Sequence, residues 1–242
     1  MSHDHFDIDE LAAYLHLTPA QVIRLAERDR VPGRKVAGSW RFSRAEIHHW
    51  MEQRLGLLDE AELAHVEGVL RRTATAAGDV PLSIADMLPV EAIAVPLRAR
   101  TRQSVITSMA QLAASTGMLW DPDKMAEAVR AREQMQPTAL DIGVALLHPR
   151  RPIPNILSEA FLALGLTGQG IPFGGSRGTL TDLFFLIGST DDRGHLRALA
   201  RISRMISDAS LLEAIRAAPN AAEVHRLIAQ WEGEFASQQD SK

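Results

Sequence analysis

Three short and almost wholly apolar segments, at residues 142–147, 160–165 and 181–189, most constrain what this chain of 242 residues can fold into. Their sequences are IGVALL, AFLALG and TDLFFLIGS, which are short for buried helices. Such runs are typical of strands that are buried on both faces of a sheet. A sheet of this kind needs helices on both of its faces, so a mixed α/β domain is expected here.

The segments around these apolar runs have helical patterns. Amphipathic helices are predicted at residues 104–117, 121–135, 195–207 and 210–218. Because helices and strands alternate from residue 81 onward, we predict an α/β/α sandwich with a mixed sheet over residues 81–235. A disordered tail is expected to follow at residues 236–242.

The beginning of the chain has a different organisation. Two short helices are predicted first, and the second has Thr18 as its N-cap and Pro19 at its first position. The stretch KVAGSWRF alternates around a Gly-Ser pair and predicts a β-hairpin, which RAEIHHWMEQR follows as a third helix. We therefore predict a small winged helix-turn-helix domain at residues 1–55, with a linker helix and linker at 56–80.

Composition excludes several kinds of site. The chain has no cysteine, which excludes disulfides, thiolate zinc sites and cysteine nucleophiles. Its net charge is −4, so a nucleic-acid site has to be local. No uncharged apolar stretch reaches the roughly 20 residues of a membrane span, and the N-terminus lacks the apolar core of a signal peptide. We therefore expect a cytoplasmic protein without a membrane span.

A local basic cluster lies in the predicted winged domain. Between residues 24 and 44 there are seven Lys or Arg residues and two acidic residues, which leaves a charge of +5. Such a cluster can neutralise DNA phosphates, with the second helix at base edges and the wing at the backbone. The alternative is that this surface contacts protein or stays solvated. The predicted DNA-binding residues are Thr18, Gln21, Arg24, Arg28, Lys35, Ser39 and Arg41.

Three residues of the second domain are candidates for chemistry. His148 directly follows the first apolar run, where a rigid strand would hold an imidazole that still reaches solvent. Histidine is largely neutral at pH 7 and can attack an electrophilic phosphorus atom. His195 begins a predicted helix, whose N-terminus attracts anions, and Arg132 offers a planar pair of donors to phosphate oxygens. By spacing alone these residues could equally be unrelated.

The remaining polar motifs give no site. The glycine-rich stretch GLTGQGIPFGGSRG lacks the spacing of a phosphate-binding loop and is interpreted as a flexible hairpin. Asp191 and Asp192 are adjacent, so their side chains diverge, and no histidine or carboxylate partner lies at metal-ligand spacing. We therefore expect neither a metal nor a cofactor.

Residues 82–230 resemble the fructose/mannitol class of phosphotransferase-system enzyme IIA domains, including its nitrogen-related branch. The similarity runs in order through the segments LSIADMLPVEAIAVPLRARTRQSVITSMAQLAASTG, AVRAREQMQPTALDIGVALLHPR and LTDLFFLIGSTDDRGHLRALARISRMISD. The resemblance implies that His148 accepts a phosphoryl group from the small carrier HPr and passes it on. It also matches His195 to the family's second active-site histidine and Arg132 to its phosphate-contacting arginine.

The sequence departs from that family next to the histidine. The family reads Gly-Ile-Ala-Ile-Pro-His-Gly-Arg, whereas this chain reads GVALLHPR, so proline follows the histidine instead of preceding it. Pro149 has no backbone N–H to offer a phosphate group, and its ring restricts the backbone of His148. An alternative is therefore a DNA-binding or protein-interaction regulator whose IIA-like domain is catalytically inactive.

Residues 7–54 resemble the winged helix-turn-helix modules of phage excisionases and MerR-type regulators. Together the two resemblances imply a phosphotransferase-system regulator that binds double-stranded DNA, with DNA binding modulated by phosphorylation of His148 from an HPr-like carrier. A third possibility is a sugar-transport component that uses its first domain for docking. Winged modules often act in pairs, so a homodimer is a further expectation.

Overall fold

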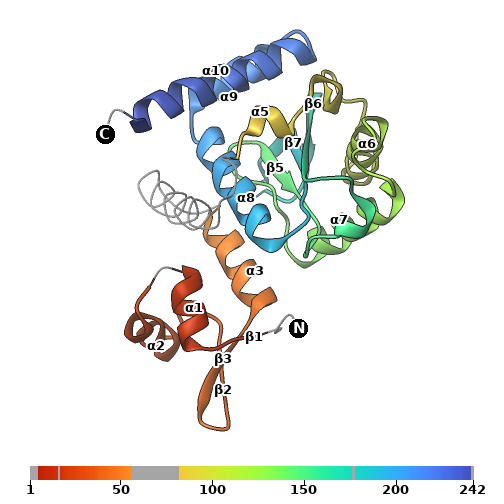
Figure 1. Cartoon of the computed structure of the whole chain (residues 1–242). Coiled ribbons are helices and arrows are strands. Elements are labelled where there is room, and N and C mark those ends of the chain that lie inside the picture. The colour runs from red at the N-terminus through yellow and green to blue at the C-terminus, as the bar shows by residue number, and fades with distance from the viewer. Residues whose placement is uncertain (1–4, 16, 56–81, 176–177, 241–242) are drawn as a thin grey trace. The chain divides into compact units, whose positions relative to one another are not determined.

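The structure is a computed structural model that describes residues 5–15, 17–55, 82–175 and 178–240 (Figure 1). The chain divides into two compact units, Met1–Val80 and Pro81–Lys242. The linker helix and linker predicted at residues 56–80 lie outside the described residues.

The N-terminal unit combines short helices with a small antiparallel sheet. Its elements are β1 (His5–Phe6), α1 (Ile8–Leu15), α2 (Pro19–Glu27), β2 (Arg34–Val36), β3 (Ser39–Ser43) and α3 (Arg44–Leu55). The strand order is β1-β3-β2, and β3 pairs antiparallel with both neighbours. Leu11, Val22, Phe42 and Ile47 are completely buried between these elements. The helix-turn-helix plan with a hairpin is thereby confirmed.

Helix α2 begins where the sequence predicts it. The Thr18 hydroxyl accepts a hydrogen bond from the Gln21 N–H at 3.3 Å, and the Gln21 side-chain oxygen accepts one from the Thr18 N–H at 2.7 Å. This reciprocal capping box satisfies two backbone donors. Pro19 occupies the first turn, where its missing N–H has no intrahelical partner to lose.

The wing differs in detail from the prediction. Its two-residue turn is Ala37-Gly38, flanked by the pair Val36 and Ser39, and does not centre on the Gly-Ser pair. Ala37 and Gly38 have φ values of 49° and 82°, the positive values that a tight hairpin turn of this type requires. Glycine adopts such a φ without steric cost, whereas an alanine is strained there.

The C-terminal unit is built on a four-stranded mixed sheet. Its elements include α5 (Ile84–Met87), β4 (Ile93–Ala94), α6 (Arg102–Ser115), α7 (Pro122–Met135), β5 (Val144–Leu147), β6 (Phe161–Pro172), β7 (Leu180–Gly188), α8 (Asp192–Ile206), α9 (Ala209–Ala217) and α10 (Ala221–Asp240). The strand order is β4-β6-β7-β5, with β6 and β7 antiparallel and the outer pairs parallel. Helices α6 and α7 lie on one side of the sheet and α5 and α8 on the other (Figure 1). The predicted mixed α/β fold is confirmed.

The apolar runs of the sequence form the centre of this sheet. All four residues of β5 are buried, and they pair in register with β7 from Val144 opposite Leu183 to Leu147 opposite Leu186. Phe161, Phe184 and Phe185 are completely buried. The chain therefore leaves β5, directly before His148, at the end of a rigid core strand.

Two sequence-based expectations in this unit differ from the structure. The glycine-rich stretch is expected to be a flexible hairpin before β7; its first half is strand β6 as far as Pro172, which pairs antiparallel with β7, and only its second half lies in the connection between the two strands. Helix α10 continues through Asp240, so residues 236–240 of the expected disordered tail are helical. Stacking of Trp231 on Phe235 and the Arg201 guanidinium 4.3 Å from the Phe235 ring centroid hold this end of the helix against α8.

A transmembrane helix is absent from the described part of the chain, because none of its helices combines the length and apolar character that a membrane crossing requires.

Candidate functional site

His148 occupies the position directly after β5, and its imidazole is fixed by the backbone. Nδ1 lies 2.8 Å from the carbonyl oxygen of Leu146. Because a carbonyl group can only accept a hydrogen bond, Nδ1 carries the proton. In the neutral imidazole the lone pair then belongs to Nε2, which is the nitrogen able to act as a nucleophile.

The expectation that this imidazole reaches solvent was wrong, because His148 keeps 3% of its surface exposed. The His195 ring lies next to it, with the two ring centroids 5.0 Å apart and the ring planes at 56°. Pro149 is buried as well. The structure thus brings together two histidines that are far apart in the sequence.

His195 lies in the first turn of α8, as the sequence predicts. Asp191 caps this helix by accepting a hydrogen bond from the Gly194 N–H at 2.8 Å. The Nδ1 atom of His195 lies 3.2 Å from the hydroxyl oxygen of Ser189, and both side chains are buried. The N-terminus of α8 is therefore next to the two imidazoles, where its partial positive charge favours an anion.

Arg132 lies in the last turn of α7 and is also buried, with 4% of its surface exposed. Its Nη1 donates a hydrogen bond to the carbonyl oxygen of Gln136 at 2.7 Å. This bond holds the guanidinium against the segment that connects α7 to β5.

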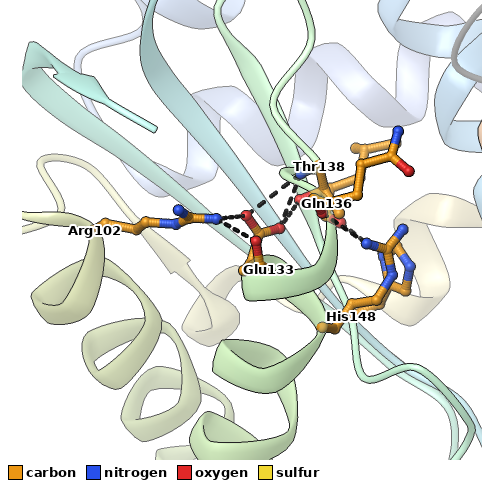
Figure 2. A network of polar contacts seen from close by, with 7 residues as sticks. Arg102, Glu133, Gln136, Thr138 and His148 are labelled. Atoms are coloured by element: carbon orange, nitrogen blue, oxygen red, sulfur yellow. Dashed lines mark hydrogen bonds and ion pairs between the residues drawn. The ribbon is translucent and has the colours of Figure 1, made fainter. Parts of the chain in front are cut away.

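The connection between α7 and β5 turns back alongside the strand. Ala139 and Ala145 form an antiparallel bridge. The Leu146 N–H also donates to the Thr138 carbonyl oxygen at 3.4 Å, so this antiparallel arrangement continues toward His148. Figure 2 shows Gln136 and His148 in one network of polar contacts. The residue that anchors Arg132 is therefore a neighbour of His148, and all three predicted residues belong to one region of the domain.

Glu133 is a buried charge in this region that is not among the predicted site residues. It keeps 2% of its surface exposed and accepts hydrogen bonds from Arg102 Nη2 at 2.7 Å, from the Thr138 N–H at 3.1 Å and from the Thr138 hydroxyl (Figure 2). A carboxylate in the last turn of a helix is unfavourable with the helix dipole. A glutamate at such a position, predicted from the sequence to end the helix, indicates that a cation from another element compensates its charge.

The seven predicted DNA-binding residues are all exposed in the N-terminal unit. Thr18 and Gln21 bind each other in the capping box, so the Gln21 side-chain oxygen is already engaged and cannot accept from a base. Arg41 lies opposite Arg34 in the wing, and the Lys35 ammonium group lies 5.3 Å from the Trp40 ring centroid. The exposed cations of α2 and the wing are thus the groups available to a phosphate backbone.

Two family models match this chain. Residues 86–231 match the family described as "Phosphoenolpyruvate-dependent sugar phosphotransferase system, EIIA 2". Residues 6–55 match a helix-turn-helix domain family.

Individual relatives agree with these matches. The nitrogen regulatory protein of Bradyrhizobium diazoefficiens is 29% identical over 151 residues, which cover 61% of this chain and 95% of that protein. The fructose-specific EIIABC component of the Bacillus subtilis phosphotransferase system is 25% identical over 127 residues, covering 52% of this chain and 20% of that protein.

Solved structures show the same fold at lower identity. Nitrogen regulatory protein IIA-Ntr from Neisseria meningitidis has a TM-score of 0.52 at 22% identity, covering 60% of this chain and 98% of that one. IIA mannitol from Escherichia coli has a TM-score of 0.51 at 19% identity, covering 58% and 97%. Because the first family model spans more than half of the chain, the protein belongs to the EIIA 2 family of the phosphoenolpyruvate-dependent sugar phosphotransferase system and carries a helix-turn-helix domain before it.

Proposed function

We propose that Nε2 of His148 accepts a phosphoryl group from an HPr-like phosphocarrier, and that phosphorylation modulates binding of double-stranded DNA by the N-terminal domain. The observation that carries the proposal is the 2.8 Å contact between Nδ1 of His148 and the Leu146 carbonyl oxygen. This contact selects the tautomer in which the lone pair belongs to Nε2, at the end of the buried strand β5.

The transfer step needs one bond to form and one to break. The Nε2 lone pair attacks the phosphorus atom, while the electron pair of the carrier's P–N bond returns to the carrier's imidazole nitrogen. The proton stays on Nδ1 of His148, and the positive charge that develops on this ring faces the Leu146 carbonyl oxygen. The Leu146 carbonyl dipole thus stabilises the product.

Positioned donors would stabilise the transferring group, whose charge is spread over its equatorial oxygens. The His195 ring lies 5.0 Å from the His148 ring, at the N-terminus of α8. When Nδ1 of His195 accepts from the Ser189 hydroxyl, Nε2 carries the proton and can donate to a phosphoryl oxygen. Arg132 supplies a permanent positive charge in the same region.

The regulatory half of the proposal rests on charge. A phosphoryl group adds about −1.5 to −2 charges, and at His148 it would stand near the exposed Arg150 and Arg151. The basic cluster of the N-terminal unit provides the electrostatic attraction between the protein and DNA, and the added negative charge weakens that attraction. The proposal places the protein in the cytoplasm and includes a homodimer, since winged modules often bind DNA in pairs.

A second candidate function has specific support. His148 keeps 3% of its surface exposed, and the buried Pro149 has no N–H to hold a phosphate oxygen. Both observations favour a C-terminal domain that serves protein interaction without transferring phosphate. The protein would then be a DNA-binding or protein-interaction regulator with an inactive IIA domain.

Labelling separates the two candidates. The protein is incubated with enzyme I, HPr and phosphoenolpyruvate labelled in its phosphate, beside His148→Ala and the control His225→Asn. His225 is suitable because it binds the Ala85 carbonyl oxygen from α10 and is remote in sequence from His148. We expect label on the wild type and on His225→Asn, and none on His148→Ala. If the wild type takes no label, phosphoryl transfer is refuted and the second candidate, a regulator with an inactive IIA domain, remains.

DNA binding is tested by fluorescence anisotropy with mixed duplex DNA at two salt concentrations. We expect the unphosphorylated protein to bind at low salt and to lose affinity as salt rises, because phosphate neutralisation releases counterions. Phosphorylated protein should bind more weakly. Equal affinity and equal salt dependence of the two forms would refute the coupling, and flat titration curves at low salt would refute DNA binding itself.

A further inference from the structure

The buried Glu133 carboxylate has no part in the transfer step described above. It lies in the last turn of α7 and keeps 2% of its surface exposed. Arg102, at the start of α6, contributes one Nη2 atom that donates both to the Glu133 carboxylate and to the Glu133 backbone carbonyl, each at 2.7 Å. Figure 2 shows this ion pair leading to Thr138 and, on the same side, to Gln136 and His148.

Stability alone is a weak reason for a charge at this place. Burying a carboxylate is costly, and the C-terminal end of a helix adds an unfavourable dipole. The partner cation only partly offsets this cost, because the Arg102 side chain keeps 36% of its surface exposed while that of Glu133 keeps 2%. The buried Glu133 carboxylate is therefore better explained by the geometry that it specifies.

The geometry in question leads to the histidine. Thr138 donates to the Glu133 carboxylate through its N–H and its hydroxyl. The Thr138 carbonyl oxygen in turn accepts from the Leu146 N–H at 3.4 Å. The carbonyl oxygen of the same Leu146 holds Nδ1 of His148 at 2.8 Å. The carboxylate is thus three contacts away from the proton that determines the tautomer of His148.

The same carboxylate also bears on Arg132. The backbone from Glu133 to Thr138 is closed into a short loop by the Glu133 side chain, and Gln136 lies inside that loop. The Gln136 carbonyl oxygen accepts the hydrogen bond of Arg132 Nη1. Fixing one loop therefore fixes the positions of both the nucleophile and the cation.

We infer that Glu133, with its charge balanced by Arg102, is a positioning residue for phosphoryl transfer. It holds the loop between α7 and β5 so that His148 presents Nε2 and Arg132 faces the same space. This inference rests on the proposed function of His148.

The chain contains a matched control for a purely structural ion pair. Glu232 on α10 keeps 8% of its surface exposed and pairs with Arg201 Nε at 3.2 Å. It also accepts from the N–H groups of Ile84 and Ala85, each at 2.9 Å, and so caps α5. Glu133 and Glu232 are thus both buried, both paired with arginine and both bound by backbone N–H groups.

The test compares Glu133→Gln with Glu232→Gln in the full-length protein. Phosphorylation by HPr gives kcat and KM, and long-range proton–nitrogen NMR of the imidazoles reports the tautomer of His148. We expect Glu133→Gln to lower kcat by about tenfold or more, because misplacement of reacting groups is costly, with KM for the carrier little changed. Its His148 should show a mixture of tautomers, whereas Glu232→Gln should keep the wild-type kcat and a single tautomer.

Milder variants cover the case in which Glu133→Gln does not fold. Thr138→Val removes the hydroxyl donor and keeps the backbone N–H, so we expect a fall in kcat of about threefold, in line with the loss of one hydrogen bond. Arg102→Lys keeps a cation able to donate to both acceptors and should restore most of the rate that Arg102→Met loses. Wild-type kcat and tautomer in both Glu133→Gln and Thr138→Val would overturn the inference.

Failure of the proposed function gives a different result. If wild-type protein is not labelled at all, the phosphoryl-transfer proposal fails, but the NMR comparison still tests whether Glu133 determines the tautomer of His148. A mixture of tautomers in Glu133→Gln and a single one in Glu232→Gln would then support the geometric inference alone.

Discussion

In the N-terminal unit the seven predicted DNA-binding side chains are all exposed, whereas His148, His195 and Arg132 of the C-terminal unit keep 3%, 4% and 4% of their surface. An exposed cation is satisfied by water, so its removal costs mainly the contact with a ligand. A buried polar group is satisfied by its neighbours, and its removal also disturbs them. Substitutions should therefore have larger and less local effects in the C-terminal unit.

Among substitutions that leave the nucleophile in place, the largest effect is expected for Arg132→Ala. We expect the rate of His148 phosphorylation to fall by about a hundredfold or more, because a positioned donor to the transferring group is lost. The Gln136 carbonyl oxygen also loses its hydrogen bond. The rate is measured by single-turnover transfer of labelled phosphate from HPr. Arg132→Lys should recover little, since an ammonium group lacks the planar pair of donors. A rate within threefold of the wild type in Arg132→Ala would contradict the expected role.

A smaller effect is expected where packing is tight. A Cβ atom on Gly165 would lie 2.7 Å from both Leu97 Cδ2 and Met109 Sδ, so Gly165→Ala should destabilise the C-terminal unit by about 1–3 kcal/mol. Gly38→Ala in the wing would meet nothing within 4 Å, and it should cost only the strain of its positive φ, about 1–2 kcal/mol. Native-state hydrogen exchange gives the free energy of each unit. A larger loss in Gly38→Ala than in Gly165→Ala would contradict the comparison.

The parts of the fold that sequence reasoning predicted are those determined by neighbouring residues. Thr18 and Pro19 determine the start of α2 within one turn. The apolar runs that form β5 and β7 can be identified as strands from their own residues, without knowledge of the strands with which they pair. The far end of β6 was missed because a glycine-rich stretch becomes strand only by pairing with β7. The end of α10 was missed because its support comes from Arg201 on α8.

The candidate site shows the same limit. The family resemblance indicated Arg132, His148 and His195, and the structure places these residues in one region. The contact between the rings of His148 and His195 joins two different elements, so it could not be derived from the local sequence. The ion pair between Arg102 and Glu133 joins residues 31 positions apart. Such contacts are determined by the tertiary fold, so a local pattern does not report them.

A test of the exposed region is Arg41→Ala. We expect DNA affinity to fall by about fivefold, a loss of about 1 kcal/mol, because one phosphate contact is removed. The slope of log affinity against log salt should decrease by about 1. Anisotropy titrations over a range of salt concentrations measure both. Arg226→Ala is the control, since Arg226 is exposed on α10 and paired with Glu223 at 2.7 Å. An equal loss in both variants would show that total charge, rather than the wing, determines binding.

The smallest effects concern two helix caps that differ in one chemical property. Thr18 caps α2 with a hydroxyl, and Asp208 caps α9 with a carboxylate that accepts from the N–H groups of Ser210 and Leu211 at 3.0 and 3.1 Å. Replacement of either by Ala should cost about 1 kcal/mol at pH 7. Urea unfolding, or hydrogen exchange in each unit, measures this loss.

Acid should remove one of these two effects and leave the other. The hydrogen bond from the Ser210 hydroxyl, opposed in part by burial and supported by the N–H groups of Leu211 and Ser210, holds the pKa of Asp208 below its ordinary value of 3.8. A carboxyl whose pKa is lower in the folded state stabilises that state above its unfolded pKa, and the contribution disappears as pH falls through the folded pKa. The cost of Asp208→Ala should therefore shrink below a pH of 3.8, while that of Thr18→Ala should not change with pH because a hydroxyl does not titrate there. If the cost of Asp208→Ala stays constant down to the lowest pH at which the protein is folded, the cap of α9 does not depend on the charge of Asp208. The difference between the polar groups of the two units would then be confined to the residues around His148.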